Sequence, residues 1–151
     1  MAFSAKYVQA LREMAGVGMM DCKKALAAAD GDKDKAIEWL REKGLAAQTK
    51  KAGKIAAEGV AYAIVDESGV GVVIEVNSQT DFVAKNEVFQ DFVNNLAAIV
   101  AKENPADVAA LQECKYPGED RTVANVLADK VLSIGENIQI RRFVRYAEGV
   151  N

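Results

Sequence analysis

The chain has 151 residues, of which 50% are hydrophobic and 27% are charged, a balance typical of soluble globular protein that excludes a disordered chain. Its net charge of −3, without a dense basic stripe, argues against direct nucleic-acid binding. No apolar stretch approaches the ~20 residues that a membrane-spanning helix requires, and the first residues lack the pattern of a secretory signal peptide. We therefore expect a cytoplasmic protein that binds neither nucleic acid nor membrane.

Residues 1–45 show helical periodicity interrupted by helix-ending residues, which predicts a domain of three short helices. Gly16 ends the first helix, and the second runs over about residues 20–29. Asp32 is suited to cap the third helix, with Gly44 in the position just beyond its end. So short a segment builds only a small core, and we expect the domain to be marginally stable unless it packs on something else.

Residues 46–58 have a different composition, rich in alanine and lysine. Both residue types favour helix, while Gly53 weakens a helix and Gly59 ends it. We interpret the segment as a partly helical connector. Its lysines are more typical of a solvated face than of a binding patch.

Residues 59–151 begin with a change of apolar period from 3.6 towards 2. Two strand-like runs, 60–65 and 70–76, flank the turn sequence Asp-Glu-Ser-Gly and predict a hairpin. A long amphipathic helix is expected over roughly residues 87–102.

A second helix of this region is expected to begin at Thr122, which can cap it, and to end at Gly135. The last element, residues 138–146, has the pattern of a strand. The order β-β-α-α-β predicts a small antiparallel three-stranded sheet packed with helices, so that the whole chain belongs to the α+β class.

Catalytic chemistry finds little support in the sequence. The chain contains no histidine, the most common general base and metal ligand. Cys22 and Cys114 are too few for a disulfide scaffold or a metal cluster, and no phosphate-binding loop or dinucleotide fingerprint is present. We therefore predict a non-catalytic protein without a cofactor or a bound metal.

The segment between the hairpin and the long helix is the sharpest functional feature. Polar residues fill 77–81, and Phe82 and Val83 follow before the amphipathic helix. In one interpretation Thr80 or Asp81 caps a helix and Phe82 packs as a hydrophobic staple. In the other, the segment is an exposed loop that pairs an acidic group with an aromatic anchor, as interface hot spots do.

Three motifs, in this order, extend over most of the chain. They are GVGMMDCKKAL at 16–26, EVNSQTDFVAKN at 75–86, and IGENI at 134–138 followed by RRF at 141–143. These motifs resemble those of the elongation factor Ts family, and residues 103–121 are the least distinctive part of the resemblance. The resemblance implies a ubiquitin-associated-like (UBA-like) fold for the three N-terminal helices, followed by one core subdomain of the factor.

The resemblance also implies a function, guanine-nucleotide exchange on the translational GTPase elongation factor Tu. Such a factor needs no catalytic residue. It binds the nucleotide-free GTPase more tightly than the nucleotide-bound form, and by reciprocity it weakens nucleotide binding by the same free energy. Thr80, Asp81, Phe82 and Val83 match the family segment that disturbs the partner's magnesium site, with Phe82 as a wedge. Further partner contacts are implied for Val17, Met19, Met20, Ile134 and Gly135.

Several alternatives stay open at this point. Packing of Met19 and Met20 in the small core is as well supported as contact with a partner. Three-helix modules also bind ubiquitin-like or peptide partners, so a general interaction adaptor is the second hypothesis, far ahead of a small carboxylate hydrolase. Because many relatives continue with a second core half, we expect either a natural short form or an excised fragment, with weaker binding to the GTPase, and leave a homo-oligomer open.

Overall fold

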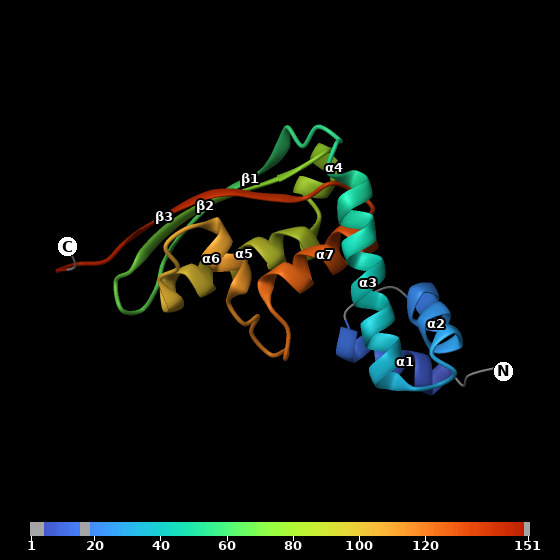
Figure 1. Ribbon diagram of the computed structural model, residues 1–151. Helices are drawn as coiled ribbons and strands as arrows, with labels where there is room; N and C mark the ends of the chain where they lie inside the picture. Colours follow the sequence, from blue (N-terminus) through green and yellow to red (C-terminus); the bar gives the residue numbers. More distant parts are fainter. Residues whose placement is uncertain (1–4, 16–18, 150–151) are drawn as a thin grey trace.

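The computed structural model describes residues 5–15 and 19–149, apart from the side chains of Tyr7, Met19 and residues 13–15. Gly16 and Val17 lie outside the described residues. Helices and a three-stranded sheet share this part of the chain, which confirms the α+β class (Figure 1). The helices are α1 (Ala5–Ala15), α2 (Met19–Ala28), α3 (Lys33–Lys51), α4 (Asp81–Ala84), α5 (Glu87–Glu103), α6 (Val108–Glu113) and α7 (Val123–Ile134), and the strands are β1 (Glu58–Val65), β2 (Gly71–Ser78) and β3 (Gln139–Tyr146).

The three strands form one antiparallel sheet in the order β1-β2-β3. In the turn between β1 and β2, the Asp66 carboxylate accepts hydrogen bonds from the Ser68 hydroxyl (2.7 Å) and the Ser68 backbone N–H (2.9 Å). The hydroxyl bond, together with the backbone N–H bonds, lowers the pKa of Asp66. The predicted hairpin is confirmed, and the Asp66 side chain fixes its turn.

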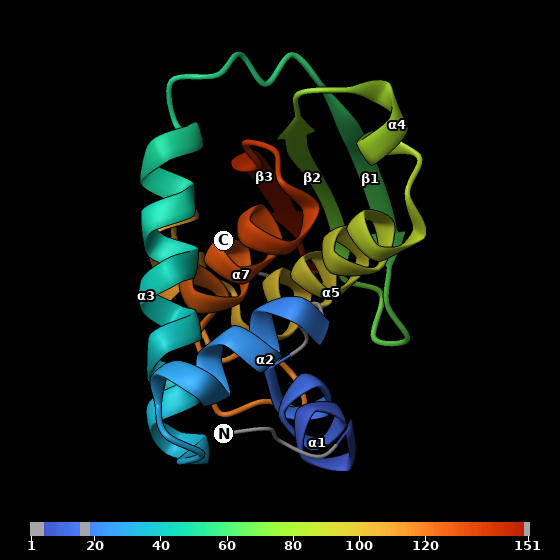
Figure 2. The same ribbon diagram turned by 90° about the vertical axis from the view of Figure 1, so that its right-hand side faces the viewer.

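The main core lies between one face of the sheet and the helices that follow it. Alternate side chains of β2, those of Val72, Ile74 and Val76, are buried on this face, as the strand period of two requires. Helix α5 crosses beneath β1 and β2, and α7 runs beside it (Figures 1 and 2). The helices contribute to this core the buried residues Phe89, Phe92, Val93, Leu96, Val100, Leu111, Val123, Val126, Leu127 and Val131.

The three N-terminal helices enclose a second, smaller apolar cluster at one end of the molecule (Figure 1). Its buried members are Val8, Leu11, Cys22, Ala25, Leu26, Ala36 and Leu40. Asp32 caps α3 by accepting the backbone N–H of Lys35 (3.1 Å), as predicted. This arrangement agrees with the UBA-like fold that was expected, while the domain boundaries at 45/46 and 58/59 stay a prediction.

The predicted end of the third helix at Gly44 is wrong, because α3 continues through Gly44 to Lys51. Gly44 is buried where α3 crosses α7, and a Cβ atom on it would lie 2.9 Å from Asp129 Oδ1 and 3.1 Å from the Ala128 carbonyl carbon. The glycine therefore allows two helices to approach closely and does not end one. As a result, α3 joins the small N-terminal cluster to the main core as one continuous helix (Figure 2).

Gly44→Ala should destabilise the protein by about 1–2 kcal/mol, because overpacking against α7 outweighs the gain in helix propensity of up to ~1 kcal/mol. Gly53→Ala is the matched control, since a Cβ atom at Gly53 meets nothing within 4 Å. Denaturant unfolding followed by circular dichroism measures both variants. Equal stability of the two variants would contradict a close approach at Gly44.

Helix α6 was not predicted from the sequence. It is only six residues long, and Asp107 caps it by accepting the backbone N–H of Ala110 (2.8 Å). The caps of α7 agree with the prediction: Thr122 accepts the N–H of Asn125 (3.3 Å), and Gly135 ends the helix with a φ of 83°. Short polar residues thus define the ends of most of the core helices.

Candidate functional site

The segment after β2 folds into one isolated helical turn, α4. Thr80 caps it through a hydrogen bond from the Val83 backbone N–H to the Thr80 hydroxyl (3.4 Å). Asn86 then caps the next helix, accepting the backbone N–H groups of Val88 (2.8 Å) and Phe89 (3.4 Å). Two capping residues six positions apart therefore separate α4 from α5, and Thr80 is the cap of the two candidates, Thr80 and Asp81, that the sequence offers.

Phe82 is the prominent side chain of this turn, with 84% of its surface exposed. The hydrophobic-staple interpretation is therefore wrong for Phe82, because a staple side chain packs against the helix that it precedes. Its neighbours behave differently: Val83 packs against the main core, and Ala84 is buried. Asp81 is exposed beside Phe82 and lies 3.9 Å from the Lys85 ammonium group.

Glu136 fastens the start of α4 to the loop between α7 and β3. One of its carboxylate oxygens accepts the backbone N–H groups of Gln79 (3.0 Å) and Thr80 (3.1 Å), and the other accepts the Thr80 hydroxyl (2.7 Å). Gln79 in turn accepts the backbone N–H of Asn137 (2.6 Å), and the buried Asn137 amide donates to the Lys54 carbonyl (2.8 Å). These hydrogen bonds join three segments that are far apart in sequence, at residues 54, 79–80 and 136–137.

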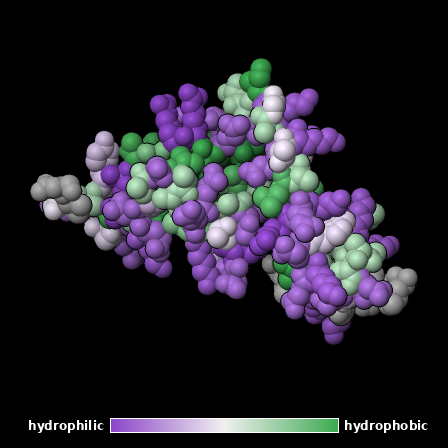
Figure 3. Space-filling view, in the orientation of Figure 1, coloured by the Kyte–Doolittle hydropathy of each residue, from purple (hydrophilic) through white to green (hydrophobic). Residues whose placement is uncertain are grey.

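The structure brings two of the predicted contact groups together. Ile134 is the last residue of α7 and packs against the main core, and the left-handed conformation of Gly135 turns the chain so that Glu136 reaches Thr80. The segment 80–83 and the loop at 134–135 therefore lie at the same end of the sheet. In the space-filling view, apolar side chains emerge among charged ones at the top of Figure 3, where the segment between α3 and β1 runs.

Two further predicted contacts, Met19 and Met20, lie elsewhere. Met19 begins α2, and Met20 is 65% exposed on the same helix and is therefore outside the small core. Helix α2 packs against α3, whereas α4 packs against β1 and β2, away from α2 (Figure 2). Val17 is outside the described residues, so only Met20 has a described side chain among these three positions.

The two cysteine thiols lie in surroundings that keep them protonated. Burial, with a smaller effect from Asp21, raises the pKa of the Cys22 thiol, and burial likewise raises that of Cys114, so both thiols are poor nucleophiles. The described residues contain no group of three or more side chains placed to hold a metal ion. Within the same residues, no helix is both long and apolar enough to cross a membrane.

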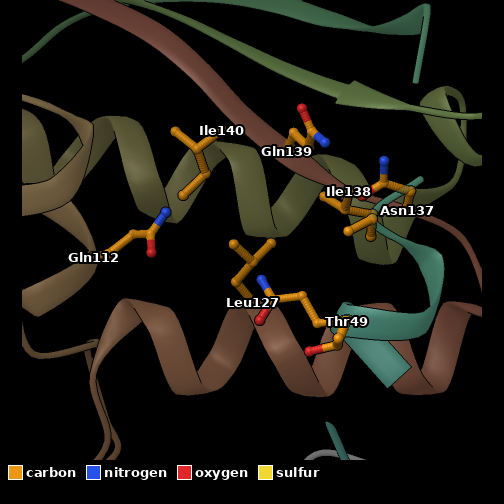
Figure 4. A pocket seen from close by; sticks show the side chains of 9 residues that line it. Thr49, Gln112, Leu127, Asn137, Ile138, Gln139 and Ile140 are labelled. Atoms are coloured by element: carbon orange, nitrogen blue, oxygen red, sulfur yellow. The ribbon is translucent and has the colours of Figure 1, made fainter. Parts of the chain in front are cut away.

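A cavity of about 470 Å³ lies between the end of α3, α7 and the start of β3 (Figure 4). Its lining combines neutral amide and hydroxyl groups, among them Gln112, Thr49 and Asn137, with apolar side chains such as Leu127. No titratable side chain lines it, and neither Thr80 nor Phe82 reaches it. Its lining therefore offers no titratable acid or base, and the exposed turn at Phe82 is the better candidate for function.

Comparison with known proteins gives one consistent result. The family model described as elongation factor TS matches residues 79–151, which include α4 and the loop after α7. Elongation factor Ts of Alkalilimnicola ehrlichii is 50% identical over 152 residues, covering 100% of this chain and 51% of that protein. The corresponding factor of Syntrophotalea carbinolica is 50% identical over 144 residues, 95% of this chain and 47% of the relative.

A third relative, elongation factor Ts of Clostridium perfringens, is 50% identical over 145 residues, 95% of this chain and 48% of that protein. The chain thus spans about half the length of the curated relatives that it matches. The similarity to these relatives covers 95–100% of this chain. The chain belongs to the elongation factor Ts family.

Proposed function

We propose that this chain acts in translation elongation as a guanine-nucleotide exchange factor, which binds elongation factor Tu·GDP in the cytoplasm and promotes GDP release. The observation that carries the proposal is Phe82, a large apolar side chain that is 84% exposed on a turn fixed at both ends by capping residues. Aromatic side chains are enriched at protein–protein interfaces, and an exposed one on a fixed turn is suited to burial by a partner. The proposed partner surface lies beside the GTPase magnesium and phosphate site.

The proposed mechanism requires binding energy and no chemical step. A GTPase holds GDP through a phosphate-binding loop and a magnesium ion. Phe82 inserts beside this site, and the Asp81 carboxylate perturbs nearby polar contacts. Together they weaken the binding of GDP by the loop and by the magnesium ion. A thousandfold faster release corresponds to roughly 4 kcal/mol of barrier. Burial of one phenylalanine side chain supplies roughly 1.5–3 kcal/mol, so supporting contacts must supply the remainder.

Two further groups of residues are proposed as those supporting contacts. Ile134 and Gly135 lie beside α4 through the Glu136 hydrogen bonds and would extend the same contact. Met20, exposed on α2, would meet the partner at a second place together with Val17 and Met19. Because α3 packs against both α2 and α7, it would hold the N-terminal helices in a fixed position on the core that carries α4.

Reciprocity provides a test that separates exchange from simple adaptor binding. If the chain weakens GDP binding, it must bind nucleotide-free elongation factor Tu more tightly than the GDP-bound form by the same factor, which we expect to exceed roughly tenfold. Isothermal titration calorimetry with both forms measures this ratio. An adaptor would bind both forms equally, and that result would reject the proposed function.

A further inference from the structure

Glu136 uses both of its carboxylate oxygens within the molecule. Oε1 accepts the backbone N–H groups of Gln79 and Thr80 at 3.0 and 3.1 Å, and Oε2 accepts the Thr80 hydroxyl at 2.7 Å. Since the hydroxyl hydrogen points to Glu136, the Thr80 oxygen presents a lone pair to the Val83 N–H, 3.4 Å away. Glu136 therefore orients the capping group of α4 as well as the backbone that precedes it.

Helix α4 has few other sources of rigidity. It comprises four residues, and a single helical turn is not stable by itself in water. Phe82 contributes little to its packing because its side chain is exposed. Val83 and Ala84 pack the turn against the core, and the Ser78 hydroxyl (2.9 Å) and the Gln90 amide (3.3 Å) donate to the carbonyls of Thr80 and Ala84. The direction in which Phe82 projects therefore depends on the fixed backbone at 79–80.

The loop that carries Glu136 is itself well fixed. Gly135 ends α7 in a left-handed conformation, and the backbone N–H of Asn137 donates to the Gln79 side chain at 2.6 Å. The buried Asn137 amide also donates to the Lys54 carbonyl at 2.8 Å. Glu136 thus connects α4 to a rigid loop, and its three accepted hydrogen bonds leave it little capacity for a direct bond to a partner.

We propose that Glu136 is a positioning residue for nucleotide exchange, which acts through Phe82 by holding the 79–83 segment in its binding geometry before the partner arrives. The inference rests on the proposed function. Without Glu136, the segment must become ordered during insertion, when the barrier to release is crossed. Removal of Glu136 should therefore lower the rate of GDP release at saturating factor. This effect should be larger than any rise in the factor concentration that gives half of the maximal rate.

Glu136→Ala removes all three accepted hydrogen bonds, and we expect a release rate at saturation that is lower by on the order of tenfold. Glu136→Gln keeps an acceptor oxygen for the two backbone N–H groups and should recover most of this rate. Glu113→Ala is the matched control, because Glu113 is exposed on α6, at the end of α5 away from α4 (Figure 1). It should match the parent protein.

A double-mutant cycle with Phe82→Ala distinguishes positioning from general destabilisation. Release of a fluorescent GDP analogue from elongation factor Tu is measured for the parent, both single variants and the pair. If Glu136 acts through Phe82, the pair is no slower than Phe82→Ala alone. If the two losses multiply, or if Glu136→Ala keeps the parent rate, the positioning role is rejected while the exchange function stands.

Hydrogen exchange of the free protein adds a readout that needs no partner. The backbone amides of Gln79 and Thr80 should lose protection in Glu136→Ala, while the amide of Ile74 in the central strand keeps it. Unchanged protection at Gln79 and Thr80 would overturn the inference. A parent protein that does not accelerate release, with these amides still losing protection, would instead reject the proposed function.

Discussion

Phe82→Ala is expected to slow the factor-stimulated release of GDP by roughly 10- to 100-fold, because about 1.5–3 kcal/mol of apolar burial at the partner is lost. The same change should alter the free energy of unfolding by less than about 0.5 kcal/mol, since the side chain is 84% exposed in the free protein. Stopped-flow fluorescence of a labelled GDP, together with denaturant unfolding of the factor, measures both quantities. A large loss of rate without a loss of stability identifies a contact residue.

Tyr146→Ala is the matched control for this prediction. Tyr146 is also an aromatic residue, is 73% exposed, and lies at the end of β3 away from α4 (Figure 1). We expect its alanine variant to keep the parent rate of release. Should both variants lose rate to the same extent, or Phe82→Ala lose none, the assignment of Phe82 as the wedge would be wrong.

Arg121→Met is expected to destabilise the fold by about 3 kcal/mol, the largest effect on stability that we predict for an ion pair of this protein. The guanidinium group pairs with Asp129, whose side chain is 4% exposed, and with Glu119 at 2.7 Å. Removing it leaves the Asp129 carboxylate buried without its partner. The other oxygen of that carboxylate, Oδ1, already has no hydrogen-bond partner among the described residues.

The double variant Arg121→Met/Asp129→Asn should recover part of this loss, because the buried charge is removed together with its partner. Arg141→Met provides a surface control, since the Arg141 side chain is 64% exposed and lies 3.7 Å from Glu75. Its effect on stability should be small. Equal unfolding midpoints for Arg121→Met and Arg141→Met would show that the buried ion pair contributes no more to stability than the surface pair.

Much of the fold could be predicted because its signals are local. Asp32, Thr80 and Thr122 each accept a backbone N–H three residues ahead, which a sequence pattern identifies without knowledge of the tertiary structure. The hairpin was also predictable, since its turn is fixed by Asp66 within the turn itself. Gly44 was misinterpreted because the reason for glycine there is Asp129, 85 positions further along the chain.

The candidate site likewise combines features that local sequence determines with features that depend on distant residues. The cap at Thr80 follows from its own sequence, but the exposure of Phe82 does not, because a staple and an exposed anchor share one local pattern. Glu136 was part of a recognised motif and was given no role, since its partners lie 56 and 57 positions away. Contacts of this kind become visible only when the sheet and α7 have placed the two loops side by side.

The most direct test of the proposed exchange function is a titration of the chain into elongation factor Tu loaded with fluorescent GDP, with excess unlabelled GDP and magnesium present. We expect a release rate that rises with factor concentration to a plateau far above the spontaneous rate, and a much lower plateau with Phe82→Ala. A parent protein that binds the GTPase, yet leaves the release rate at its spontaneous value, would contradict this expectation.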